Sequence, residues 1–303
     1  NYTSDPDNPL TGQVWYNETA NTLKVNTGAL VNAWATGNSM NTARYWLAGC
    51  GTQTAALAFG GSSPYFALTE SYNGTNWTEV GDLNLARSFL AGAGTNTAAL
   101  AFGGSYPHKA ETELWNGTNW TEVNDLGTAR YALAGVGTQT AALAFGGSVA
   151  PKAQTELWNG TNWTAVNNLN TGRPGVAGAG ISTSALAFGG QPDLAITESW
   201  NGTNWTEVND MNTGRNGVAP AGVSNTSALA SGGQDASPAK LSVTETWNGT
   251  NWTEVNDLNT ARSLLAGCGT NTVALAFGGL VPGASSATEE WGETGGNKTI
   301  TTD

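Results

Sequence analysis

Residues 87–123 have the sequence RSFLAGAGTNTAALAFGGSYPHKAETELWNGTNWTEV, and near copies of this unit fill most of the chain. Gly-Gly pairs recur at 60–61, 103–104, 146–147, 189–190, 232–233 and 278–279, at spacings of 43, 43, 43, 43 and 46 residues. The six arginines share this register, at Arg44, Arg87, Arg130, Arg173, Arg215 and Arg262. Six tryptophans do the same, at Trp34, Trp77, Trp120, Trp163, Trp205 and Trp252. A period of this length is typical of repeat architectures.

Each unit contains four short segments with strand character, which in the quoted copy are SFLAGAG, TAALAFGG, AETELW and NWTEV. In the second segment, Leu100 and Phe102 alternate with Ala99 and Ala101, as the two-residue period of a strand requires. Asn-Gly joins the third segment to the fourth and favours a two-residue type I′ turn. No segment has a capped helical pattern. The sequence therefore predicts an all-β, six-bladed β-propeller of four-stranded antiparallel blades.

The unit resembles the kelch repeat in three features: an Arg-led first strand, a second strand that ends in Gly-Gly, and aromatic residues ending the third and fourth strands. The resemblance covers about residues 42–291 and implies the same propeller fold. The unit departs from kelch after the third strand, where Trp-Asn-Gly, or Tyr72-Asn73-Gly74 in the first copy, replaces the usual Tyr-Asp.

The two ends of the chain are expected to complete the ring. The last unit ends its third strand at Trp291 and lacks a fourth, whereas Trp34 lies one repeat before Trp77. We therefore expect residues from about 30–37 to form the outer strand of the last blade, which removes a sheet edge. If a neighbouring chain donated this strand, a dimer or filament would form. The predicted divisions are an N-terminal hairpin or connecting segment at 1–29, the propeller at 30–291 and a C-terminal tail at 292–303.

The composition of the 303 residues excludes several functions. The formal net charge of −12 argues against a nucleic-acid partner. The longest apolar runs fall far short of the ~20 residues that a membrane-inserted helix needs. One histidine and two cysteines leave few metal ligands, and we expect neither a metal nor a cofactor. The chain begins at Asn1 with no signal-peptide pattern, so a mature or trimmed form is expected.

The repeated arginines, glutamates and tryptophans are candidates for identical ligand sites, and fucose-binding six-bladed lectins are similar in using these residue types. The alternative is structural: ion pairs and hydrogen bonds between blades that hold the ring, and aromatic side chains that bridge neighbouring blades. The ligand-binding candidates are Trp115, Trp158, Trp200, Trp247, Arg87, Arg130, Arg173, Glu113, Glu156 and Glu198.

Two further residue sets are candidates for covalent modification. Cys50 and Cys268 occupy the same slot in the first and last units, so a disulfide could lock the ring; the alternative is two buried thiols. The NGTNWT segments contain N-x-T sequons, whose alternative role is turn formation. The possible N-glycosylation sites are Asn73, Asn76, Asn116, Asn119, Asn159, Asn162, Asn201, Asn204, Asn248 and Asn251.

The loops between the second and third strands differ most among the copies and are expected to emerge on one face as a contact surface. They span 62–68, 105–110, 148–154, 191–196, 234–242 and 280–287. Enzymatic activity is not expected. His108 is the lone histidine, whereas the copper-dependent kelch oxidases need several histidines. The repeated S-x-D-x-G-x-x-W boxes and the arginine triad of sialidases cannot be picked out in this chain. Paired carboxylates for glycoside hydrolysis are the remaining enzymatic alternative.

The segment PDNPLTGQVWYNETANTLKV resembles hairpin modules of tailed-phage virion proteins, and the repeats look like those of marine phages. This resemblance implies a fibre, tail or surface-decoration protein, located outside cells or on the virion. Its expected partners are other virion or filament subunits, copies of itself and a cell-surface glycan. The competing hypothesis is an extracellular structural protein that assembles into filaments by terminal strand donation.

Overall fold

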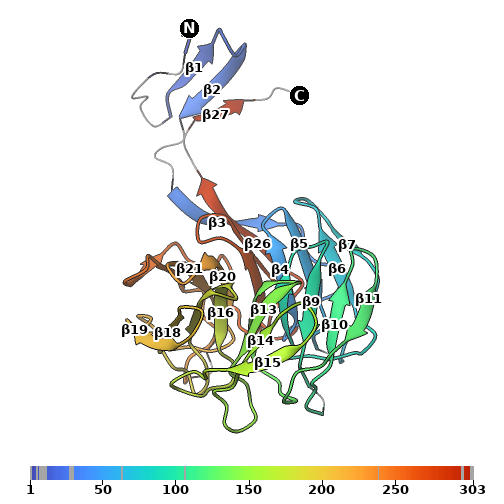
Figure 1. The fold of residues 1–303 in the computed structure, drawn as a ribbon. Helices are drawn as coiled ribbons and strands as arrows, with labels where there is room; N and C mark the ends of the chain where they lie inside the picture. The colour runs from blue at the N-terminus through green and yellow to red at the C-terminus, as the bar shows by residue number, and fades with distance from the viewer. Residues whose placement is uncertain are drawn as a thin grey trace. The chain divides into compact units, whose positions relative to one another are not determined.

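The computed structural model describes residues 2–4, 6, 12–26, 31–62, 64–105, 107–237, 239–294 and 297–300. The regular structure in this part of the chain consists of strands, arranged as six four-stranded antiparallel sheets and one three-stranded sheet. The first strand of each four-stranded sheet lies beside the first strands of two others, so the six sheets surround a common axis (Figure 1). The structure confirms the predicted all-β, six-bladed propeller.

The blades follow one another along the chain. Blade 1 contains β4 (Ala48–Thr52), β5 (Ala55–Phe59), β6 (Thr69–Tyr72) and β7 (Trp77–Glu79). Blade 2 contains β8 (Ala91–Gly94), β9 (Ala99–Phe102), β10 (Thr112–Trp115) and β11 (Trp120–Val123). Blade 3 contains β12 (Ala134–Thr138), β13 (Ala141–Phe145), β14 (Thr155–Trp158) and β15 (Trp163–Val166). Blade 4 contains β16 (Ala177–Ile181), β17 (Ser184–Phe188), β18 (Thr197–Trp200) and β19 (Trp205–Val208). Blade 5 contains β20 (Ala219–Ser224), β21 (Ser227–Ser231), β22 (Thr244–Trp247) and β23 (Trp252–Val255). Blade 6 contains β24 (Ala266–Gly269), β25 (Ala274–Phe277), β26 (Thr288–Thr294) and β3 (Val31–Gly37).

The outer strand of blade 6 comes from the other end of the chain. β3 lies beside β26 in the strand order β24-β25-β26-β3, in the region where the sequence placed the outer strand. Residue 30 lies outside the described residues. Trp34 on β3 contacts Trp291 with ring centroids 5.4 Å apart, and Asn259 donates to the carbonyl oxygen of Trp34. Blade 6 is joined in turn to blade 1, because the indole N–H of Trp77 donates to Thr288 Oγ1 at 3.0 Å.

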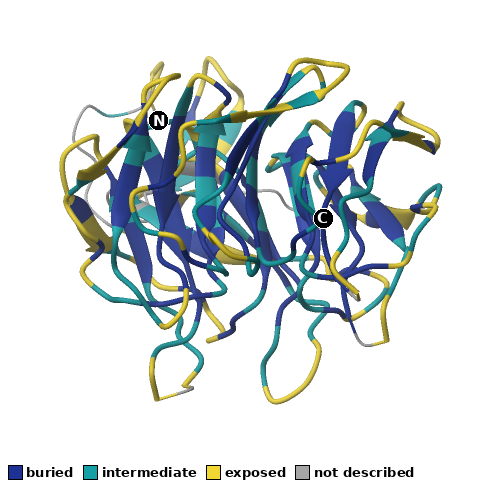
Figure 2. Cartoon of the chain, turned by 60° about the horizontal axis from the view of Figure 1, so that its bottom comes forward, coloured by how far each residue is buried: buried dark blue, intermediate teal, exposed yellow. Residues whose placement is uncertain are grey.

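The core lies between neighbouring blades, where the strands are buried and the connecting loops exposed (Figure 2). Between blades 1 and 2, Phe59 packs on Trp120 with ring centroids 4.9 Å apart, while the Trp120 indole N–H donates to Thr69 Oγ1. A Cβ on Gly92 would lie 2.5 Å from Phe59 Cζ, so only glycine leaves room for the ring. Five of the six inner strands have glycine at this position, and blade 5 has Pro220 there.

The remaining three strands form a small sheet of their own. β1 (Val14–Asn17), β2 (Thr22–Asn26) and β27 (Asn297–Ile300) are antiparallel, in the order β1-β2-β27. The compact units are residues 1–33 with 292–303, and residues 34–291. The segment 292–303, expected as a tail, thus contains the end of β26 and a strand that pairs with β2; residues 295–296 and 301–303 lie outside the described residues.

Candidate functional site

The repeated Arg and Glu side chains form buried ion pairs, which lie within single blades and not between blades as the structural alternative expected. Their shortest N–O distances lie between 2.6 and 3.1 Å. In blade 2, Glu113 accepts from the Arg87 guanidinium at 3.0 Å and from the backbone N–H of Asn84 at 2.7 Å. Burial lowers the pKa of Arg87, and the Glu113 carboxylate opposes this effect. The pair therefore fixes the segment that leads into the blade's first strand.

This burial corrects the prediction that the repeated residues bind ligands. Arg87, Arg130 and Arg173 are at most 1% exposed, and the glutamates Glu113, Glu156 and Glu198 at most 4%. The four candidate tryptophans are each 1% exposed, and their indole N–H groups donate to backbone carbonyls of neighbouring loops. These tryptophans are Trp115, Trp158, Trp200 and Trp247. A ligand cannot reach such groups, and their repetition reflects the requirements of the blade.

The ten sequon asparagines are exposed, in hairpin loops whose geometry differs from the prediction. Tyr72 pairs with Trp77, so the first such loop contains four residues, Asn73 to Asn76. Asn73 does not have a positive φ, whereas Gly74 has a φ of 90°. The expected type I′ turn is therefore wrong: Asn73 Oδ1 instead accepts the N–H groups of Thr75 and Asn76. The other NGTN segments repeat these two bonds.

Cys50 and Cys268 are buried free thiols in this structure, which is the alternative to the disulfide. The thiol of Cys50 lies 3.5 Å from the carbonyl oxygen of Thr95, and that of Cys268 lies 3.5 Å from the carbonyl oxygen of Thr52. Both side chains line the space enclosed by the six inner strands, which we call the axial channel. Burial raises the pKa of Cys50 to about 12 and raises that of Cys268 as well. Both thiols are therefore protonated and unreactive near neutral pH.

The variable loops emerge at one end of the ring, which we call the loop face. The backbone N–H of each repeated arginine donates to a residue of the variable loop of the preceding blade, as Arg87 does to Phe66 and Arg130 does to Lys109. Because strands alternate in direction, the sequon loops lie at the opposite end. Residues 63, 106 and 238 of the variable loops lie outside the described residues.

The loop face carries a group of aromatic rings over blades 1 to 3, which we call the aromatic surface. It consists of Trp46, Tyr65, Phe89, His108 and Tyr131, which line a hollow of about 460 Å³ together with Ser105 and Pro107. Trp46 stacks on Phe89 with centroids 3.6 Å apart, Phe89 meets Tyr131 edge-on at 5.5 Å, and His108 stacks on Tyr131 at 5.1 Å. Tyr65 is 49% exposed.

Sequence reasoning located this surface only in part. Tyr65 and His108 fall in two of the variable loops, but Trp46, Phe89 and Tyr131 were not singled out. A signal was present, because the two positions after each repeated arginine vary strongly among the copies: Tyr-Trp, Ser-Phe, Tyr-Ala, Pro-Gly, Asn-Gly and Ser-Leu. Variable positions beside an invariant residue are expected where a rigid scaffold presents a binding surface.

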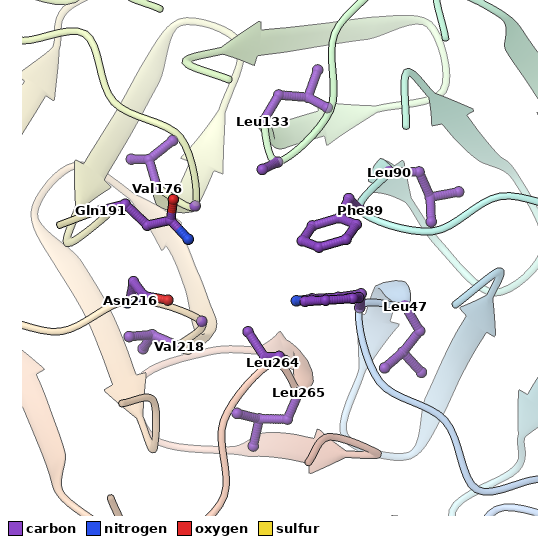
Figure 3. A pocket seen from close by; sticks show the side chains of 14 residues that line it. Leu47, Phe89, Leu90, Leu133, Val176, Gln191, Asn216, Val218, Leu264 and Leu265 are labelled. Atoms are coloured by element: carbon purple, nitrogen blue, oxygen red, sulfur yellow. The ribbon is translucent and has the colours of Figure 1, made fainter. Parts of the chain in front are cut away.

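The second of these positions forms a strained rim around the axis. It has positive φ in all six blades, at Trp46, Phe89, Ala132, Gly175, Gly217 and Leu264. Left-handed backbone costs a non-glycine residue about 1–2 kcal/mol. Five of the six rim residues donate their backbone N–H to the carbonyl of the rim residue before them, so the rim is a circle of hydrogen bonds with one gap. Inside the rim lies a cavity of about 120 Å³, the axial pocket (Figure 3).

No protein-family model and no curated protein matches this chain. Among the described residues, no helix has the length and apolar character of a membrane span, and no group of three His, Cys, Asp or Glu side chains could hold a metal ion. Fold and site together define the class of this protein as a six-bladed β-propeller with an aromatic surface on its loop face. The resemblances to kelch repeats and to phage virion proteins stay predictions.

Proposed function

We propose that this protein is a non-enzymatic recognition module that binds a glycan on a host surface through the aromatic surface. We further propose that it belongs to a tailed-phage virion, as a fibre, tail or surface-decoration protein with other virion subunits as partners. The observation that carries the binding proposal is the stacked row of Trp46, Phe89, Tyr131 and His108. No other feature of the loop face gathers so many rings in contact within the described residues.

Glycan recognition suits the chemistry of this surface. The negative face of an aromatic ring attracts the polarised C–H groups on the apolar side of a sugar ring. The hollow beside Tyr65 and Tyr131 also offers the Tyr hydroxyls and the His108 ring nitrogens, which can bond sugar hydroxyls. A formal net charge of −12 favours a neutral or cationic ligand over an acidic polymer.

The burial of the repeated glutamates supports binding without hydrolysis. The glutamates that share the repeat register are enclosed in ion pairs, so they are not available as an acid and a nucleophile. Lys109 and Glu111, near the hollow, bind each other at 3.5 Å. The six-bladed scaffold instead holds its aromatic loops in fixed positions, which favours recognition.

The alternative function is a structural filament assembled by terminal strand donation. The position of β3 beside β26 within one chain supports a self-contained module over this alternative. A filament of intact propellers would form even when the aromatic surface is altered, so the two functions are separable by mutation.

The test is a glycan array and a host-cell binding assay with three proteins: the wild type, the double variant Tyr65→Ala/Tyr131→Ala and the control Val223→Ser. Val223 is 55% exposed and lies at the mouth of the axial channel that is opposite the loop face. Val223→Ser therefore also removes exposed apolar surface, but outside the proposed binding site. We expect the double variant to bind at least tenfold more weakly and the control to bind as the wild type does.

Three results would contradict the proposal. Absence of wild-type binding to any glycan or host cell would remove the recognition function. Shortened glycans after prolonged incubation with the wild type would indicate an enzyme. Equal binding by the double variant would move the contact surface away from blades 1 to 3.

A further inference from the structure

The axial pocket has an unusual asymmetry for a ring built from near-identical units. Its floor is aliphatic all round, with one buried side chain from each blade: Leu47, Leu90, Leu133, Val176, Val218 and Leu265. Its rim is bulky over blades 6, 1 and 2, at Leu264, Trp46 and Phe89. Over blades 3, 4 and 5 the rim residues are small, so the pocket opens on that side, where the side chains of Gln191 and Asn216 border it (Figure 3).

The circle of backbone hydrogen bonds is broken on this open side. Of the six bonds that could link the rim residues described here, the bond from Gly217 N–H to the Gly175 carbonyl is not made. Gly175 lies between two polar side chains, since a Cβ built on it would be 3.6 Å from Gln191 Cγ and 3.9 Å from Asn216 Cβ. One backbone donor and one acceptor therefore border an apolar cavity without pairing with each other.

A second unpaired donor lies on the bulky side. Eleven of the thirteen tryptophans donate their indole N–H in a defined bond, and Trp15 has an interaction of its own. The Trp46 indole N–H has no acceptor among the described residues. Trp46 belongs both to the aromatic surface and to the axial pocket. A ligand stacked on the aromatic surface could therefore extend a substituent into the pocket past this donor.

We propose that the axial pocket receives the acetamido group of an N-acetylated sugar; this inference rests on the proposed glycan-binding function and specifies its ligand. The methyl group would contact the aliphatic floor. The carbonyl oxygen would accept from the Trp46 indole or from Gly217 N–H, and the amide N–H would donate to the Gly175 carbonyl or to Gln191 Oε1. An acetamido group supplies this combination of one methyl, one acceptor and one donor.

A plain hydroxyl suits the pocket less well. A hydroxyl would pair with the same donors and acceptor, but it has no apolar group to cover the six aliphatic side chains. A methyl group gains from the same surroundings. The cavity of about 120 Å³ has room for a group of four heavy atoms but not for a second sugar ring beneath the rim. The site therefore suits a substituent of the stacked sugar.

The experiment compares matched sugars by saturation-transfer NMR and titration: N-acetylglucosamine with glucose, and N-acetylgalactosamine with galactose. We expect the wild type to prefer each acetamido sugar about tenfold or more, with strongest saturation at the methyl protons. Trp46→Phe keeps the stacking ring but removes the donor, and should reduce the preference about threefold to tenfold. Ala132→Leu should abolish it by filling the open side.

Ala132→Leu is expected to fold, because Leu264 occupies the equivalent position at φ 58° and Ala132 has φ 54°. A melting curve for each variant verifies folding. Equal affinity within each sugar pair, or a preference that survives Ala132→Leu, would overturn this inference while leaving glycan binding intact. No binding of any of the four sugars or of longer glycans would overturn both proposals.

Discussion

Ser231 breaks the repeat at the interface between blades 5 and 6. The other five blades have a phenylalanine at this position: Phe59, Phe102, Phe145, Phe188 and Phe277. Ser231 is 1% exposed and its hydroxyl has no hydrogen-bond partner. An unsatisfied buried polar group costs about 1–3 kcal/mol. Ser231→Ala removes this penalty and loses only a little packing, so we expect it to stabilise the protein by about 1–2 kcal/mol.

Restoring the phenylalanine should have the opposite effect. In four of the other interfaces, the glycine of the next blade faces a phenyl ring, as Gly92 faces Phe59, whereas blade 5 has Pro220 at the glycine position. At the corresponding Gly267, a Cβ would lie 2.6 Å from the Pro220 carbonyl oxygen, so blade 5 backbone occupies this space. Ser231→Phe would force the backbone apart, and we expect a loss of about 1–3 kcal/mol.

The assay is urea unfolding followed by tryptophan fluorescence, with midpoints and slopes compared at fixed pH. The predicted order of stability is Ser231→Ala, then wild type, then Ser231→Phe, with similar slopes. A destabilised Ser231→Ala would mean that the hydroxyl is satisfied in solution. A stabilised Ser231→Phe would mean that the interface is looser than this packing allows.

Three further predictions concern the buried pairs, the thiols and the rim. Glu113→Gln should destabilise the protein by about 3–5 kcal/mol in urea unfolding, because it leaves the Arg87 charge buried without its partner, whereas the exposed control Glu122→Gln should stay within about 0.5 kcal/mol. Because burial raises the pKa values of both thiols, their contribution to stability is present below pH 9 and is lost as the pH rises from 9 toward 12, by up to ~1.4 kcal/mol per pH unit for each thiol. The variant Cys50→Ala/Cys268→Ala should flatten this pH dependence. Rapid alkylation of the native thiols at pH 8 would refute the prediction. Ala132→Gly should relieve left-handed strain and stabilise the protein by up to about 1 kcal/mol in thermal unfolding, whereas a loss of stability would show that the rim backbone is unstrained.

The repeat register was enough to predict the propeller. Gly-Gly pairs, arginines and tryptophans recur because each blade uses the same contacts, so six copies imply six similar sheets. The sequence could not reveal that Arg87 and Glu113 face each other inside one blade, because register alone does not separate a buried pair from an exposed site. The Asn-Gly turn was misassigned because Asn73 bonds Thr75 and Asn76, which widens the loop to four residues.

The candidate site was less accessible to sequence reasoning. The variable loops indicated the face that carries the aromatic surface, and Tyr65 and His108 lie in two of them. The contribution of Trp46, Phe89 and Tyr131 depends on the left-handed rim and on the distance between adjacent blades, and neither is encoded in a short motif. The axial pocket likewise arises only when six chain segments meet around the axis.

The most direct test of glycan recognition by the aromatic surface is an experimental structure of the protein with the best-binding N-acetylated oligosaccharide. Density for a sugar ring against Phe89, Tyr131 or His108, with its acetamido group directed into the axial pocket, is the predicted result. Density at the sequon loops on the opposite face, or in a blade interface with the aromatic surface empty, would contradict it.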